Sequence, residues 1–120
     1  MEIEHIEFID ENAKEAIVFI KNEQIEIKCF SCPCLLEQGS IVEEPLECID
    51  TKNVAISDNY SKIRKKENFW GYEFQVQIIN REEGLVEADG IRMHIDIDEI
   101  PNDIEVGMYI YFETSRIDIW

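Results

Sequence analysis

The chain has 120 residues, of which 45% are hydrophobic, and its 27 acidic residues outnumber 11 lysines and arginines to give a formal net charge of −16. This length fits one domain and this hydrophobic content supplies a core, which excludes a disordered chain. Because the acidic residues are spread from Glu2 to Asp118, the charge belongs to the folded surface. It disfavours nucleic acids and anionic membranes as partners and favours cationic ones, which are basic proteins, polyamines or metal ions, unless the charge serves solubility alone.

No apolar run in the sequence approaches the roughly 20 residues that a membrane-spanning helix needs. Residues 1–4 lack the basic start and apolar centre of a secretory signal peptide. We therefore expect a soluble, cytoplasmic protein that forms one domain over residues 1–120 and keeps its cysteines reduced.

The chain begins with a pattern of short strands. Residues 3–10 are expected to form the first strand, and residues 15–21 and 24–30 form a β-hairpin that turns at Asn22 and Glu23. In the second hairpin strand, apolar and charged residues alternate, so one face of the hairpin is predicted to be buried.

A loop follows over residues 31–45, because Pro33, Gly39 and Pro45 interrupt the strand pattern. Short strands are predicted at residues 41–42, 46–50 and 53–57. Residues 57–68 are polar, show no strand pattern and hold four of the eleven basic residues. We expect a long loop or a short helix there, joining two halves of the domain at about residues 1–56 and 69–120.

The second half shows clearer alternation. Residues 72–80 predict a strand, and the loop after it ends in Gly84, which suits a positive φ. Asp89-Gly90 is a strong signal for a two-residue hairpin turn. The remaining expected elements are strands at residues 85–88, 91–97, 107–113 and 116–120 and one helical turn within residues 98–106.

These elements predict an all-β single domain, a barrel or sandwich of about seven to nine strands with at most one short helix. The meander at residues 72–97, the connection at 98–106 and the glycine-led strand at 107–113 resemble an OB-fold, so the second half is expected to be OB-like. The predicted core comprises Val18, Ile20, Ile25, Ile27, Phe74, Val76, Ile78, Met93, Ile95, Ile110 and Phe112.

The candidate metal ligands or reactive thiols are the four cysteines, Cys29, Cys32, Cys34 and Cys48. Cys29 and Cys32 have the spacing of a zinc knuckle, and Cys48 would supply a further ligand. However, Cys29 shares the apolar face of Ile27, and Cys48 is in phase with Leu46, as is typical of buried cysteines. We therefore predict two core and two loop cysteines and no cofactor, with a small metal- or thiol-based protein as the alternative.

Residues 62–72 combine basic and aromatic side chains, and Lys62 and Arg64 precede Trp70 and Tyr72. On an OB-like barrel such a pattern suits single-stranded nucleic acid, which gives a second alternative function. The net charge of −16 opposes the approach of phosphates, so we favour a solvated basic loop whose aromatic neighbours pack in the core. The four residues remain candidates for contact with a partner.

Asp96, Asp98 and Glu99 belong to an acidic cluster around Pro101. Carboxylates suit hard cations, but the spacing is not that of an EF-hand loop and the central glycine is missing. We expect a solvated strand end whose carboxylates are candidate contacts for a cationic partner.

No phosphate-binding glycine loop, Gly-x-Ser-x-Gly or His-Glu-x-x-His motif is present, and His5 and His94 match no catalytic pattern, so the sequence does not predict an enzyme. In size and charge the chain resembles the small acidic proteins of bacterial toxin–immunity systems. That resemblance implies a non-catalytic protein-binding module, an immunity or inhibitor protein that binds a basic protein through its acidic surface.

Overall fold

The computed structural model describes residues 1–43 and 45–119. Its strands are β1 Glu2–Asp10, β2 Glu15–Lys21, β3 Glu26–Ser31, β4 Leu46–Ile49, β5 Lys52–Ile56, β6 Lys62–Lys65, β7 Tyr72–Asn80, β8 Leu85–Ala88, β9 Ile91–His94, β10 Tyr109–Thr114 and β11 Arg116–Asp118, with one 3₁₀ turn, η1, at Ile97–Glu99. The predicted all-β class is therefore confirmed. Within the described residues no helix is long and apolar enough to cross a membrane.

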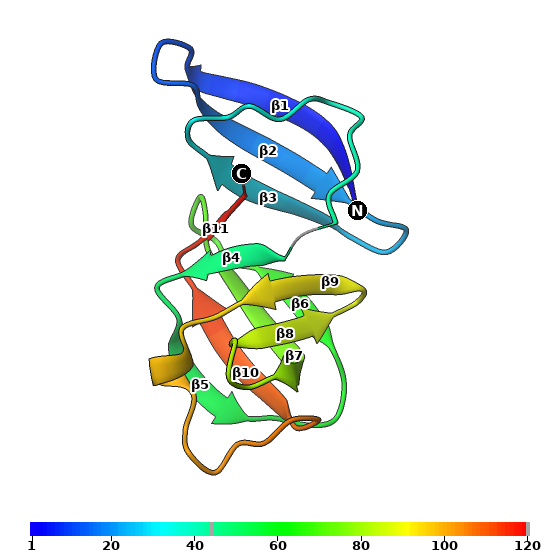
Figure 1. The fold of residues 1–120 in the computed structure, drawn as a ribbon, viewed down its shortest axis with the longest axis vertical. Helices are drawn as coiled ribbons and strands as arrows, with labels where there is room; N and C mark the ends of the chain where they lie inside the picture. The colour runs from blue at the N-terminus through cyan, green and yellow to red at the C-terminus, as the bar shows by residue number, and fades with distance from the viewer. Residues whose placement is uncertain (44, 120) are drawn as a thin grey trace.

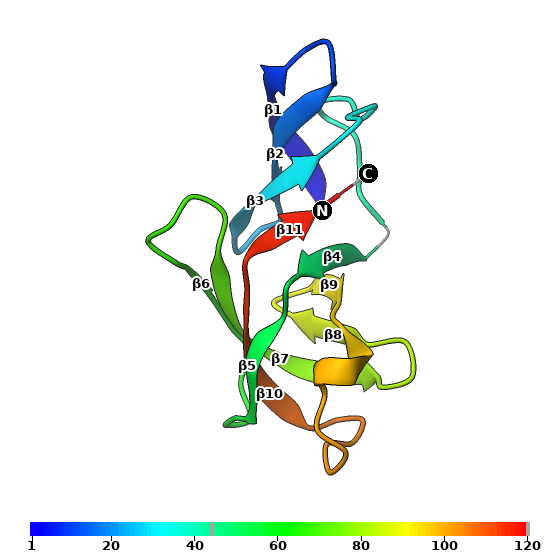
Figure 2. The ribbon, with the colours of Figure 1, turned by 90° about the vertical axis from the view of Figure 1, so that its left-hand side faces the viewer.

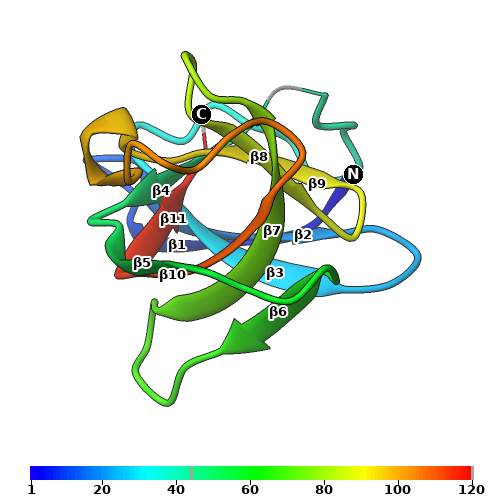
Figure 3. The ribbon, with the colours of Figure 1, turned by 90° about the horizontal axis from the view of Figure 1, so that it is seen from below.

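The strands form one sheet in the order β1-β2-β3-β11-β4-β9-β8-β7-β10-β5, and β6 pairs with β7 outside this path. Among the strands of the described residues, β11 with β3 and β4 with β9 are the parallel pairs. Figure 1 shows two parts of this sheet, β1, β2 and β3 at the top, which we call the N-terminal sheet, and a strongly curved part formed by the later strands below, which we call the curved sheet. The path does not close, but β5 continues β4 after residues 50–51, so the curved sheet turns back on itself (Figure 3).

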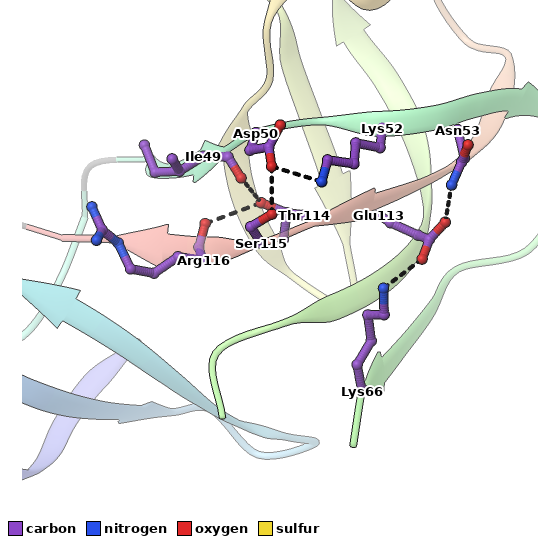
Figure 4. A network of polar contacts seen from close by, with 9 residues as sticks. All are labelled: Ile49, Asp50, Lys52, Asn53, Lys66, Glu113, Thr114, Ser115 and Arg116. Atoms are coloured by element: carbon purple, nitrogen blue, oxygen red, sulfur yellow. Dashed lines mark hydrogen bonds and ion pairs between the residues drawn. The ribbon is translucent and has the colours of Figure 1, made fainter. Parts of the chain in front are cut away.

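Two neighbouring strand breaks lie where β11 leaves the curved sheet to pair with the N-terminal sheet. Between β4 and β5, Asp50 adopts a positive φ of 60°, which aspartate tolerates better than most residues. Between β10 and β11, the backbone N–H of Ser115 donates to the carbonyl of Ile49 at 3.0 Å, and the Ser115 hydroxyl donates to the Asp50 carboxylate at 2.6 Å. The two breaks are therefore held together, as Figure 4 shows, and β11 continues upward to pair with β3.

The predicted turns of the second half form as expected. Asp89 and Gly90 both adopt positive φ, 50° and 81°, as a two-residue turn between β8 and β9 requires. Gly84 has a φ of 67°, and a Cβ at this position would lie 2.4 Å from the carbonyl oxygen of Ile95. Only glycine fits this close approach between the loop and the segment after β9.

The predicted core is also confirmed, since ten of its eleven residues are buried: Val18, Ile20, Ile27, Phe74, Val76, Ile78, Met93, Ile95, Ile110 and Phe112. Ile25 is only partly buried, because the hairpin turn is longer than expected. Asn22 accepts hydrogen bonds from the backbone N–H groups of Gln24 and Ile25 at 2.8 and 3.0 Å. This side-chain turn occupies residues 22–25, so β3 begins at Glu26.

The structure differs from expectation in the polar segment of residues 57–68, which contains β6 instead of only a loop or helix. Ile63 packs against the core while Lys62 and Arg64 stay exposed, so this short strand does alternate. Its pairing partner is β7, 72–75, and this long-range contact cannot be read from the local sequence. The described residues form eleven strands, and this number counts separately the two pairs that the breaks at residues 50–51 and 115 divide, β4 with β5 and β10 with β11.

Candidate functional site

The four cysteines do not share one environment. Cys29, Cys34 and Cys48 are buried, whereas Cys32 is exposed and its thiol lies 3.5 Å from the carbonyl oxygen of Ala13. The Cys48 sulfur lies 3.7 Å from the sulfur of Met93 in the core. Among the described residues no group of three or more His, Cys, Asp or Glu side chains is arranged to hold a metal ion.

Burial also controls the chemistry of the two innermost thiols. Desolvation raises the pKa of Cys29 well above its ordinary value, and the nearby Cys48 raises it further. Desolvation likewise raises the pKa of Cys48, with Glu47 adding to the effect. Both side chains are therefore neutral thiols near pH 7, and a neutral thiol is a poor nucleophile and a poor metal ligand.

The basic and aromatic candidates of residues 62–72 separate onto different surfaces of the β6–β7 hairpin. Lys62 and Arg64 are exposed on β6, and Arg64 forms a 3.5 Å ion pair with Glu73. Trp70 is partly buried, and Tyr72 is only 4% exposed. The four side chains therefore do not form one continuous basic and aromatic surface.

Trp70 belongs to a cluster that joins the hairpin tip to the N-terminal sheet; we call it the basic–aromatic cluster, and it comprises Lys28, Phe30, Phe69, Trp70 and Arg116. The Trp70 ring meets Phe30 and Phe69 edge to face, at centroid distances of 5.7 and 4.7 Å. Lys28 Nζ lies 3.6 Å from the Phe69 centroid, and the Arg116 guanidinium lies 4.3 Å from that of Phe30. These cations and rings contact each other, so the same side chains are less available to bind an external ligand.

Arg116 is held on Phe30 by a carboxylate as well. Its Nε and Nη2 atoms donate to the two oxygens of Asp118 at 2.6 and 2.9 Å. This hydrogen bonding raises the pKa of Arg116 above its ordinary value. The charge of the guanidinium is thus balanced within β11.

The acidic candidates lie on a different side of the molecule. Asp96 caps η1, and its carboxylate accepts a hydrogen bond from the N–H of Asp98 at 2.9 Å. Asp98 and Glu99 are exposed on the same turn. Figures 2 and 3 both place η1 away from β6, so the acidic turn and the bases of β6 cannot contact the same small ligand.

The two histidines also lie apart, each with a carboxylate neighbour. His94 Nδ1 is 3.0 Å from Glu47, and His5 Nε2 is 3.2 Å from Glu7. The His5 ring stacks on Phe19 at a centroid distance of 5.9 Å. Among the described residues, no hydrogen bond or ion pair joins either histidine to a cysteine.

The sequence patterns missed an apolar groove at the end of β1. The groove has a volume of about 420 Å³ and is lined by Phe8, Glu11, Lys14, Cys34, Leu35, Leu36 and Glu37. Phe8 is 48% exposed and Leu35 is 73% exposed, so two large apolar side chains of the lining face solvent. Leu35 lies in a loop and Phe8 at a strand end, and neither position follows a periodic pattern that would have identified it.

No family model, no curated protein and no solved structure matches the chain. The assignment of function therefore depends on the arrangement of charge, apolar surface and free strand edges described above.

Proposed function

We propose that this protein is a non-catalytic protein-binding module that recognises a basic protein through its acidic surface, as an immunity or inhibitor protein does. The observation that carries the proposal is a difference between the surroundings of the basic and the acidic side chains. Basic side chains are engaged in contacts within the protein, whereas most carboxylates face solvent.

Six of the eleven lysines and arginines form ion pairs with carboxylates: Lys21 with Glu4, Lys52 with Asp50, Arg64 with Glu73, Lys66 with Glu113, Arg92 with Glu87 and Arg116 with Asp118. Arg81 donates to the backbone carbonyls of Ile104 and Pro101 at 2.7 and 2.9 Å. Lys65 donates to the carbonyls of Lys66 and Asn68. Few basic groups are therefore free to bind an external anion.

The carboxylates show the opposite balance. The chain has 27 acidic residues, and six of them take part in these pairs. The other carboxylates therefore produce the negative electrostatic field that an approaching protein meets. Such a field accelerates encounter with a basic protein and repels nucleic acid. The neutral buried thiols and the internally occupied basic–aromatic cluster give less support to the metal, thiol and nucleic-acid alternatives.

The test is capture from a lysate of the source cells on the immobilised protein, followed by purification of the captured partner. We expect a basic protein whose association rate falls steeply between 50 and 500 mM NaCl, because salt screens charge–charge attraction. A binding curve that does not change with salt would contradict the proposal, as would the failure to capture any protein that binds directly after purification.

A charge-neutralised variant provides the control. The substitutions Glu82→Gln, Glu83→Gln, Asp98→Asn and Glu99→Gln remove four charges from exposed positions without touching the core. We expect slower association of the same partner and a shallower salt dependence, with little change in the dissociation rate. Single-stranded DNA should bind neither protein at 150 mM NaCl.

A further inference from the structure

We propose that the outer edge of β1 is the docking site, and that the basic partner adds an extended segment of alternating basic and apolar residues to this edge as a further strand. This inference rests on the proposed function, because it names the place and the mode of binding of the same cationic partner. Three features of the N-terminal sheet carry it.

The first feature is an incompletely paired strand edge. β1 pairs with β2 on one side. On its other side, residues 39–42 of the loop after β3 pair with only the first residues of the strand. The N–H of Ile3 donates to Ser40, and the N–H of Gly39 donates to Ile3, both at 2.8 Å. Beyond Ile3, the described residues provide no backbone partner on this outer edge up to Asp10. A strand edge of this kind is a template for an added strand.

The second feature is the difference between the two faces of β1. Its pairing with β2 places Ile6 and Phe8 opposite the buried Val18 and Ala16, and Phe8 lines the apolar groove. The intervening Glu7 lies on the opposite face. An added strand with alternating residues would therefore place its apolar side chains beside Ile6 and Phe8 and its basic side chains beside Glu7.

The third feature is charge, which identifies the kind of partner. Six of the first fifteen residues are acidic and only Lys14 is basic. Glu11 and Glu37 line the groove itself. A second copy of this chain would bring the same carboxylates together across the new pair, which opposes a dimer formed through β1. A basic segment would instead meet opposite charges along the edge.

The free edge of β6 provides a contrast within the same molecule. β6 is paired only with β7 among the described strands, and it carries Lys62, Arg64 and Lys65. Lysines protect strand edges, and these charges would repel a basic segment. Strand addition by the proposed partner is therefore expected at β1 and not at β6.

The experiment uses the full chain, labelled with ¹⁵N, and an acetylated and amidated peptide of sequence KVKIRVK. We expect backbone amide shifts concentrated in β1 and the groove, slower hydrogen exchange along β1, and no comparable change in β6. The same peptide N-methylated at every backbone amide keeps its charges and side chains but has no N–H group on either edge to donate to β1. It should bind at least about tenfold more weakly.

Two pairs of variants locate the site. Glu7→Lys with Glu11→Lys should weaken peptide binding about tenfold, whereas Glu82→Lys with Glu83→Lys, which changes the net charge equally, should weaken it much less. Leu35→Asn should weaken binding, whereas Val106→Asn, at another exposed apolar position, should not. All six substituted positions are exposed, so we expect the four variants to fold, and their amide spectra will check this.

The proposed docking site is overturned if the peptide does not bind, if N-methylation has no effect, or if both members of a variant pair behave alike. These outcomes are separate from failure of the proposed function. A captured basic partner whose binding depends on salt but is indifferent to Glu7→Lys with Glu11→Lys would retain the proposed function and reject β1 as its docking site.

Discussion

The hydroxyl of Tyr72, on β7, accepts a 2.8 Å hydrogen bond from the backbone N–H of Lys28, on β3. Tyr72 therefore connects the curved sheet to the N-terminal sheet. Desolvation is the main cause that raises the pKa of this phenol, so the group remains neutral over the ordinary pH range. The aromatic ring stacks on Phe74 in the core at a centroid distance of 5.8 Å.

We expect Tyr72→Phe to lower the free energy of unfolding by about 1–2 kcal/mol, because the Lys28 N–H would lose its partner in a mostly buried position. Urea denaturation followed by tryptophan fluorescence would measure the change. Tyr109→Phe is the matched control, since Tyr109 is only partly buried and its hydroxyl has no hydrogen-bond partner among the described residues. Equal effects of the two substitutions would show that the Tyr72 hydroxyl does not stabilise the junction between the sheets.

A substitution at Thr114 would test the hydrogen bonds that hold the two strand breaks together in Figure 4. Its hydroxyl lies 2.7 Å from the Ile49 carbonyl and 3.0 Å from that of Arg116, and the residue is 2% exposed. We expect Thr114→Val to cost about 1–2 kcal/mol of unfolding free energy, because these carbonyls lose a buried donor.

Thr51→Val is the control for this prediction. Thr51 is also buried, at 5% exposure, but its hydroxyl has no hydrogen-bond partner within residues 1–43 and 45–119. Replacing an unsatisfied hydroxyl with a methyl group should leave the stability unchanged or slightly increased. A larger loss for Thr51→Val than for Thr114→Val in urea denaturation would contradict the assigned hydrogen bonds.

Strand alternation and turn chemistry were sufficient to predict most of this fold. The boundaries of β7 and β8 and the turn at Asp89-Gly90 follow from local sequence, since a half-buried strand and a positive φ each restrict residue type directly. β6 was missed because its four residues become a strand only through pairing with β7. The Asn22 turn was predicted too short because a side chain, not the backbone alone, closes it.

The candidate site was less accessible to sequence reasoning for a similar physical reason. Trp70 contacts Phe30, forty residues earlier, because β11 brings the two sheets together. The groove at Phe8 and Leu35 depends on the path of a loop. Only the burial of Cys29 and Cys48 was predictable, because each lies in phase with apolar neighbours on its strand.

The thiols should react at very different rates. In the native protein, Cys32 is exposed, whereas the other three cysteines are buried and the pKa values of Cys29 and Cys48 are raised by desolvation. We expect one thiol to react rapidly with Ellman's reagent at pH 8 and four to react in 6 M guanidinium chloride. Cys32→Ser should abolish the rapid phase. Rapid reaction of two or more thiols in the folded protein, or stoichiometric zinc in protein purified without chelator, would instead favour the metal- or thiol-based alternative.

The pKa values of Glu4 and Glu26 should be shifted in opposite directions from the ordinary carboxyl pKa. The hydrogen bond between them is the largest cause of both shifts: it lowers the pKa of Glu4, and it raises the pKa of Glu26. Glu26 therefore favours the folded state at pH values below its unfolded pKa, and this contribution is lost as the pH rises through its folded pKa. Glu4 acts in the opposite sense, with a contribution present above its unfolded pKa and lost as the pH falls through its folded pKa.

Titration of the side-chain carboxyl carbons by NMR would measure both midpoints. Glu4→Gln should move the Glu26 midpoint down toward its ordinary value, because the substitution removes the neighbouring negative charge. Glu7→Gln, which removes a carboxylate from the same strand but not from this pair, should leave the Glu26 midpoint in place. If Glu4→Gln leaves Glu26 unchanged and Glu7→Gln shifts it, the carboxyl that controls Glu26 is not Glu4, and the side-chain arrangement on this face of β1 would need to be reassigned.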